Sequence, residues 1–183
     1  MRVFVALPIP EEVKQTIGVF MGKLRSSGAD VKWVERENLH FTLRFLGELE
    51  EGDLPRVEDS IKTLSGFKSF QAKTGPFGVF PSLSSPRVFW IGLEKGKEEM
   101  EEISRALNLA FKERGFPQED KPFQAHLTIG RARSPKNIPA LKQLLETLSP
   151  PQVEFSVAEV SLFQSTLTPR GPIYRKLFRQ PLS

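Results

Sequence analysis

Two short stretches of the chain decide the fold: residues 40–43, His-Phe-Thr-Leu, and residues 126–129, His-Leu-Thr-Ile. On a β-strand, side chains two positions apart lie on the same face, and the residues between them lie on the other face. In each stretch the histidine and the threonine therefore share one face, and the two apolar residues lie behind them. We predict two strands that each present an imidazole and a hydroxyl on one face and bury the other.

These are the only two histidines in the protein. A lone histidine on a strand is more often a packed or surface residue than a catalyst, but two in matched settings favour catalysis. Histidine has an unperturbed pKa near 6.5, so one imidazole can act as a base while the other acts as an acid. A threonine hydroxyl can donate a hydrogen bond to a phosphate oxygen. We predict that His40 and His126 are catalytic, and that Thr42, Thr128 and Arg131 bind the phosphate of a phosphodiester.

Arg131 and a few other residues are further candidates. Arg131 lies on the opposite strand parity to the second histidine, so it must reach the site through a bend, for which Gly130 is the obvious position. Arg44 shares the parity of Thr42 and could reach a phosphate, although a solvated or salt-bridged surface position is the commoner outcome for such an arginine. Three aromatic residues are candidates for stacking on a nucleobase, although most aromatic residues of such a chain belong to the core: Trp33, Phe123 and Tyr174.

The rest of the chain predicts alternating helices and strands. Apolar residues recur at helical spacing in four segments: 13–24, 54–64, 100–111 and 141–148. Segments rich in Val, Phe and Ile, separated by Gly and Pro, predict seven strands: Arg2–Leu7, Leu39–Leu46, Gln71–Phe80, Arg87–Leu93, Ala125–Gly130, Val153–Phe163 and Ile173–Arg179. Residues 81–86 and 166–172 are predicted to be loops.

A comparison at a fixed offset suggests an internal duplication. His126 follows His40 by 86 residues (126 − 40), and the same offset aligns residues 3–7 with 89–93 and Phe77 with Phe163. Each half then runs strand, helix, histidine-bearing strand, helix, strands. We predict one bilobal α+β domain over residues 1–183, with two antiparallel sheets related by a pseudo-twofold axis, a central cleft between them and helices outside.

Composition sets the class of protein and its partners. The chain has 183 residues, of which 39% are hydrophobic and 26% charged, and its net charge of +4 mildly favours an anionic partner. It has no cysteine, which excludes disulfides and cysteine zinc sites, and two histidines make any zinc site improbable. The apolar run at residues 1–10 is followed at once by two glutamates, so we interpret it as a strand and not a secretory signal. We expect a cytoplasmic monomer with no membrane segment, no metal and no cofactor.

The two motifs resemble those of the two-histidine phosphoesterase superfamily, which is defined by two His-x-Thr/Ser-aliphatic motifs. The resemblance is closest to its LigT-like branch, the RNA 2′,3′-cyclic phosphodiesterases, also called RNA 2′,5′-ligases. Nearly the whole chain contributes typical stretches: residues 2–7, 33–47, 122–131, 161–165 and 169–174. The resemblance implies a bilobal α+β fold and metal-independent hydrolysis of a terminal 2′,3′-cyclic phosphate to a 2′-phosphate.

The resemblance also implies roles that the motifs alone do not separate. His40 would be the proton donor to the departing 3′ oxygen, and His126 would be the proton acceptor that activates water. Some family members also join RNA halves through a 2′,5′ linkage, which we regard as a side activity. Its partners would be RNA ends or nucleotides that carry a 2′,3′-cyclic phosphate.

Two other functions stay open from the sequence. A non-catalytic module that binds a nucleotide or RNA end could use the same threonine and arginine contacts, although binding alone does not require two proton carriers. A phosphodiesterase that acts on another small cyclic phosphate would share the motifs and differ only in the loops.

Overall fold

The structure is a computed structural model that describes residues 1–183. All four predicted helices are present: α1 (Glu11–Arg25), α2 (Leu54–Lys62), α3 (Lys97–Glu113) and α4 (Ile138–Thr147). Their buried residues follow the predicted apolar spacing; in α1, for example, Ile17 and Leu24 are fully buried. Three 3-10 turns complete the helical content: η1 (Arg36–Asn38), η2 (Glu51–Asp53) and η3 (Thr63–Gly66).

The strands also follow the prediction, with corrections at their ends. They are β1 (Arg2–Pro8), β2 (Val31–Trp33), β3 (His40–Glu48), β4 (Phe70–Ser82), β5 (Ser85–Lys95), β6 (Leu127–Ala132), β7 (Glu154–Val157), β8 (Glu159–Thr168) and β9 (Gly171–Pro181). The prediction missed β2, because three residues are too few to show a period. The predicted loops at 81–86 and 166–172 are wrong in extent, since the flanking strands continue through them into tight hairpin turns.

One of the predicted strands is divided into two strands in the structure. The segment 153–163 divides at Ala158 into β7, which pairs with β4, and β8, which pairs with β1. These two partners lie in different parts of the sheet, so the break at this residue sends the chain from one lobe to the other. Hydrophobic periodicity does not report such a break, because both pieces have the composition of a strand.

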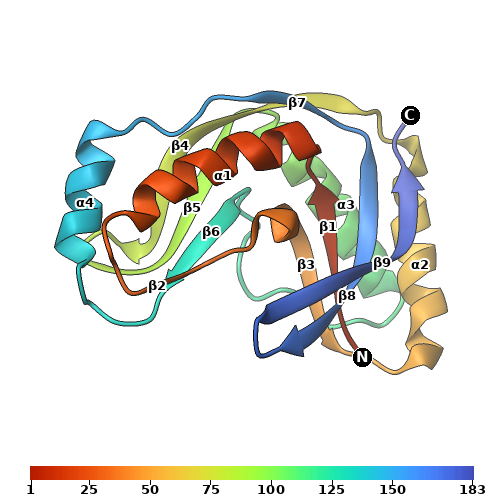
Figure 1. The fold of residues 1–183 in the computed structure, drawn as a ribbon. Helices are drawn as coiled ribbons and strands as arrows, with labels where there is room; N and C mark the ends of the chain where they lie inside the picture. The colour runs from red at the N-terminus through yellow and green to blue at the C-terminus, as the bar shows by residue number, and fades with distance from the viewer.

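All nine strands belong to one curled, antiparallel sheet in the order β7-β4-β5-β6-β3-β1-β8-β9, with β2 on β6. The strands of the two lobes pair with each other only where β3 meets β6, at Phe41 and Leu127. The predicted α+β class and the bilobal arrangement are confirmed, and the two sheets are continuous at this junction (Figure 1). Beyond this pair the two strands do not pair with each other.

The lobes do not coincide with the halves of the sequence. β8 comes from the second half but pairs with β1, and β4 comes from the first half but pairs with β5. The helices cross over in the same way, since α1 contacts α4 and α2 contacts α3. Neither half of the chain therefore supplies a whole lobe.

The residues that pair between strands show how closely the proposed duplication keeps its offset of 86 residues. Phe41 and Leu127, which are 86 residues apart (127 − 41), pair with each other, as two positions on a pseudo-twofold axis would. Their outer neighbours, Leu7 in β1 and Ile91 in β5, are 84 residues apart (91 − 7). We propose the duplication on these grounds, with a two-residue shift between the histidine-bearing strands and the strands beside them.

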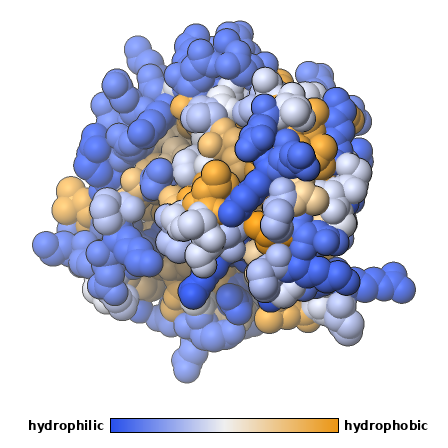
Figure 2. Space-filling model, turned by 90° about the vertical axis from the view of Figure 1, so that its left-hand side faces the viewer, coloured by the Kyte–Doolittle hydropathy of each residue, from blue (hydrophilic) through white to orange (hydrophobic).

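The core lies behind the histidine-bearing strands. Phe41, Leu43, Leu127 and Ile129 are all 5% exposed or less and pack into one large apolar cluster with the helices. Figure 2, which views the side of α4, shows hydrophilic side chains over most of that face, with smaller apolar patches between them. No helix is both long enough and apolar enough to cross a membrane.

Candidate active site

The junction between the lobes brings the two motifs together. His40 is the first residue of β3, and His126 directly precedes β6. Counting outward from the antiparallel pair Phe41–Leu127, His40 comes opposite Thr128, and Thr42 comes opposite His126. These four side chains are partly exposed, while the apolar residues between them are buried, which matches the predicted alternation.

Both imidazoles are held in the same way. His40 Nδ1 lies 2.6 Å from the carbonyl oxygen of Asn38, and His126 Nδ1 lies 2.6 Å from the carbonyl oxygen of Gln124. A carbonyl oxygen only accepts hydrogen bonds, so Nδ1 of each ring must carry the proton. In the neutral form, Nε2 of each ring is then the basic atom, and in the imidazolium Nε2 is the atom that can donate a proton.

The surroundings of His40 are closed. Its ring lies 4.9 Å from the ring of Phe4 and 5.4 Å from that of Tyr174, between centroids, and its Nε2 lies 2.8 Å from Thr42 Oγ1. Burial lowers the pKa of His40 to about 4, and the positive charge of Lys14 acts in the same direction, while the hydrogen bond to Asn38 opposes the shift. In the free protein at neutral pH, His40 is therefore uncharged.

The surroundings of His126 are more open. Its ring lies 5.3 Å from the ring of Phe80 and 6.0 Å from that of Trp90, both edge-on. Its Nδ1 hydrogen bond is exposed, and its Nε2 makes no hydrogen bond within the protein. The two histidines thus share an orientation but differ in their access to solvent.

Each histidine-bearing strand contains a β-bulge at the same place. Val5 and Ala6 pair with Arg44 and Thr42, so the residue between these two, Leu43, has no partner. On β6 the pairing likewise skips Ile129, 86 residues further on. A bulge inserts one residue and reverses the side of the sheet on which the following residues lie.

The bulge on β6 provides the bend that Arg131 requires. Burial raises the pKa of the Tyr174 hydroxyl above its usual value, and the positive charges of Arg131 and Arg2 oppose that rise. The backbone at Gly130 is closely covered, because an added Cβ would lie 2.7 Å from Val31 Cγ1. Arg131 is exposed, and because the pairing of β6 skips Ile129 we expect its side chain on the side of the motif histidines.

The bulge on β3 has the opposite consequence for Arg44. It turns this side chain away from the histidines, so the prediction that Arg44 could reach a phosphate is wrong. Arg44 is 5% exposed; it donates a hydrogen bond to Asn108 Oδ1 at 2.8 Å and another to the carbonyl oxygen of Pro117, and it forms an ion pair with Glu119 at 3.0 Å. It is a buried structural residue and not a surface one.

The three aromatic candidates separate in the structure. Trp33 is partly buried; it packs over Gly130 and against the core, with its ring 6.3 Å from that of the buried Phe89. Phe123 also packs against the core cluster. Tyr174 alone lies beside a motif histidine, in a cavity of about 250 Å³ that His40 and Lys14 also line.

Sequence reasoning missed two residues around His40. Asn38 is buried, and besides its carbonyl contact with the histidine it donates a side-chain hydrogen bond to the carbonyl oxygen of Pro172 at 2.9 Å. The ring of Phe4 packs against the His40 ring. Strand alternation in β1 could have identified Phe4, because its neighbours Val3 and Val5 enter the core. No group of three or more His, Asp or Glu side chains is arranged to hold a metal ion.

This bilobal fold and its two opposed His-x-Thr strands define a two-histidine phosphoesterase. The sequence profile of the 2′-5′ RNA ligase superfamily matches residues 10–168, and the chain belongs to that family. The resemblance inferred from the motifs is confirmed.

Several relatives match along their whole length. The chain is 39% identical over 175 residues to an RNA 2′,3′-cyclic phosphodiesterase of Methanothermobacter thermautotrophicus, covering 94% of each chain. It is 36% identical to a protein of the same name from Thermotoga maritima, covering 97% of this chain and 94% of the relative. A crystal structure of a Thermus thermophilus protein superposes with a TM-score of 0.82 at 30% identity, covering 99% and 97% of the two chains. Escherichia coli LigT, crystallised with 3′-AMP, has a TM-score of 0.80 at 23% identity, covering 100% and 98%, which shows the shared fold.

Proposed function

We propose that the protein hydrolyses the 2′,3′-cyclic phosphate at an RNA end to a 2′-phosphate. The observation that carries the proposal is the pair of opposed histidines, each with its Nδ1 fixed by a backbone carbonyl and its Nε2 available for proton transfer. The names of the full-length relatives, RNA 2′,3′-cyclic phosphodiesterase, support the substrate. An in-line displacement at phosphorus requires a proton acceptor on the side of the attacking water and a proton donor on the side of the departing oxygen.

In the proposed mechanism, His126 Nε2 takes a proton from water as the water oxygen attacks phosphorus. The bond between phosphorus and O3′ breaks, and His40 Nε2 gives its proton to O3′. The products are a 2′-phosphate and a free 3′-hydroxyl. The hydroxyls of Thr42 and Thr128 and the guanidinium of Arg131 donate hydrogen bonds to the non-bridging oxygens, where negative charge increases in the transition state.

The donor role requires that His40 gain a proton when substrate binds. In the free protein its pKa of about 4 keeps it neutral at pH 7. A cyclic phosphate carries one negative charge, and an opposite charge within hydrogen-bond distance favours the imidazolium and raises the pKa. The substrate would thus supply the charge that makes His40 an acid.

The test is product analysis on a short RNA with a 2′,3′-cyclic phosphate, in excess EDTA. Wild type is expected to yield the 2′-phosphate, and His40→Ala and His126→Ala are each expected to lower kcat/KM by about 10²- to 10⁴-fold. Lys68→Ala, which alters an exposed lysine outside the site, is a matched control. RNA that binds without turnover would support a binding module instead, and turnover of only other cyclic phosphates would support the second alternative.

Ligation uses the same chemistry with a different nucleophile. If the 5′-hydroxyl of a second RNA replaces water, loss of its proton to His126 and protonation of O3′ produce a 2′,5′ linkage. We propose this as a side activity, and it can be measured in the same assay by adding RNA with a 5′-hydroxyl. The monomeric state and the cytoplasmic location also remain predictions, and light scattering tests the first.

A further inference from the structure

We propose that Lys32 binds the phosphate that links the terminal nucleotide of an RNA chain to the nucleotide before it. The inference rests on the proposed function and deepens it, because it assigns a contact to the RNA chain beyond its cyclic end. Lys32 is the middle residue of β2 and is exposed. An enzyme with this contact acts better on RNA ends than on small cyclic phosphates.

The alternation in β2 directs Lys32 to the side of the sheet that carries the histidines. Val31 is buried in the core, and Trp33 packs against the same core cluster. Because side chains two positions apart share a face of a strand, Lys32 lies on the opposite face to these two residues. β6 pairs with β2 and buries its core residues on the same side, so Lys32 shares its face with His126.

The register of β2 places Lys32 beside Arg131. These two residues are direct partners in the β2–β6 ladder. Side chains opposite each other in an antiparallel pair share a face, with Cβ atoms about 4.5–5.5 Å apart. Arg131 follows Thr128 by three positions (131 − 128), one of which the bulge skips, so Lys32 Cα lies roughly 8–10 Å from Thr128 Cα. That separation suits the phosphate next to the cyclic one along an RNA chain.

Hydrogen bonds at both ends of β2 hold this register. The backbone N–H of Val34 donates to the carbonyl oxygen of Ile129 at 2.9 Å. The N–H of Arg133 donates to the carbonyl oxygen of Asp30 at 2.8 Å. The two strands also pack closely, because an added Cβ at Gly130 would lie 2.7 Å from a β2 side chain. The sheet therefore fixes the backbone position from which the lysine extends.

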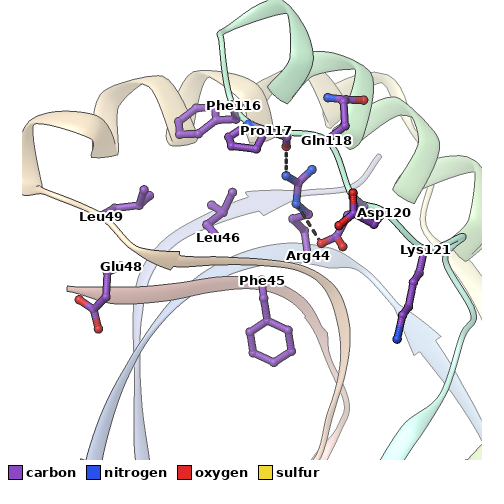
Figure 3. A pocket seen from close by; sticks show the side chains of 11 residues that line it. Arg44, Phe45, Leu46, Glu48, Leu49, Phe116, Pro117, Gln118, Asp120 and Lys121 are labelled. Atoms are coloured by element: carbon purple, nitrogen blue, oxygen red, sulfur yellow. Dashed lines mark hydrogen bonds and ion pairs between the residues drawn. The ribbon is translucent and has the colours of Figure 1, made fainter. Parts of the chain in front are cut away.

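The positive charges at this position have no partner within the protein. Like charges directly opposite each other in a sheet are destabilising. Neither Lys32 nor Arg131 forms an ion pair, and nor does Asp30, the acidic residue two positions before the lysine. Arg44 on β3 is different, because Glu119 pairs with its guanidinium (Figure 3). An RNA chain supplies the missing negative charge, with one phosphate for each of the two cations.

The experiment compares Lys32→Gln with wild type on three substrates at low salt. They are 2′,3′-cyclic AMP, the diadenosine dinucleotide that ends in a 2′,3′-cyclic phosphate, and the same dinucleotide with an uncharged methylphosphonate between its nucleosides. Loss of one exposed phosphate contact should lower kcat/KM for the charged dinucleotide about 3- to 10-fold. The other two substrates should be turned over at unchanged rates, because neither has the charged phosphate that Lys32 binds.

The salt dependence of the reaction provides a second measurement. Each phosphate contact with a single strand contributes about 0.7 to the slope of log affinity against log salt concentration. For the charged dinucleotide, the slope of log kcat/KM should therefore be shallower by about 0.7 in Lys32→Gln. Lys32→Arg should keep both the rate and the slope. Lys68→Gln, which alters an exposed lysine outside the site, should change neither.

Equal losses on all three substrates would overturn the inference, since Lys32 would then contact the cyclic phosphate or support β2. An unchanged rate on the charged dinucleotide would also overturn it. A loss on the methylphosphonate as large as that on the charged dinucleotide would mean that the lysine contacts the second nucleoside instead of the phosphate. If wild type turns over none of the three substrates, the proposed function fails instead.

Discussion

The two histidine-bearing strands, β3 and β6, are built on one plan and end in different environments. A histidine fixed through Nδ1 begins β3, and another directly precedes β6. Both strands contain a bulge after the threonine, and they pair with each other at the residues that follow the histidines, Phe41 and Leu127. Yet His40 is enclosed by Phe4 and Tyr174, whereas His126 is open to solvent on one side. A similar backbone therefore positions both rings, and the side chains around His40 bury it and lower its pKa to about 4.

The largest expected effect separates the roles of the two histidines. In His126→Ala, which should lose about 10²- to 10⁴-fold at pH 7, the residual reaction depends on His40 alone. A proton donor must be protonated, so residual kcat/KM should fall about tenfold for each pH unit above the free-protein pKa of about 4. The pH profile of the wild type cannot make this distinction, because exchanging the roles leaves the total number of protons the same. A residual rate that rises through pH 4 and then levels would identify His40 as the base.

The next effect concerns stability and tests the buried setting of His40. Its folded pKa of about 4 lies below the unfolded value near 6.5, so the unfolded chain binds the proton first as the pH falls. The free energy of unfolding should therefore lose up to about 3 kcal/mol between pH 6.5 and pH 4 from this group alone. Urea denaturation at pH 7.5 and 4.5 measures it, and His40→Gln should remove this part of the slope.

The same titration on His126→Gln provides the comparison. If both variants reduce the slope equally, the two histidines are equally buried and the contrast between the lobes is lost.

A smaller effect compares the free energy of unfolding after changes beside the two bulges, at Arg44 on β3 and at Gly130 on β6. Arg44→Met leaves Glu119 and the Pro117 carbonyl without their partner and should lower the free energy of unfolding by about 2 kcal/mol. This is less than the usual cost of breaking a buried ion pair, because Glu119 is 42% exposed. Gly130→Ala should cost about 1–3 kcal/mol, since its Cβ would lie 2.7 Å from a Val31 methyl group. Arg56→Met, at an exposed ion pair, should cost under about 1 kcal/mol. Thermal or urea unfolding ranks the three, and an Arg44 variant no worse than the Arg56 variant would contradict the buried role.

The smallest effect separates the two threonines. Thr42→Val and Thr128→Val should each lower kcat/KM by about tenfold, as loss of one hydrogen bond to the phosphate predicts. Thr42 also contacts His40 Nε2, so only Thr42→Val should shift the pH dependence of the reaction. Serine at either position should restore most of the rate. Thr16→Val, whose hydroxyl bonds within α1, is the control and should have no effect.

Much of the fold could be predicted from the sequence, because its signals are local. The apolar spacing of α1 and α3 and the alternation in residues 40–43 depend only on the period of each element, so they survived in the structure almost unchanged. The prediction for Arg44 was wrong because alternation assumes a regular strand. The bulge at Leu43, which residue types alone do not reveal, reverses the alternation for the residues after it. The break at Ala158 and the strand β2 were missed for the same kind of reason.

The sequence by itself determined the two His-x-Thr strands, the pair of candidate catalytic histidines and the α+β class, since these depend on residue type and on periods of two or about 3.6 residues. Only the tertiary structure decided which strands share a lobe, which histidine is enclosed, and that Arg44 is turned away from the histidines. These features come from pairing between distant segments: the exchange of β4 and β8 between lobes, the single contact of β3 with β6, and the two bulges. Burial and pKa follow from that assembly, because a side chain's access to water depends on neighbours that lie far from it in the sequence.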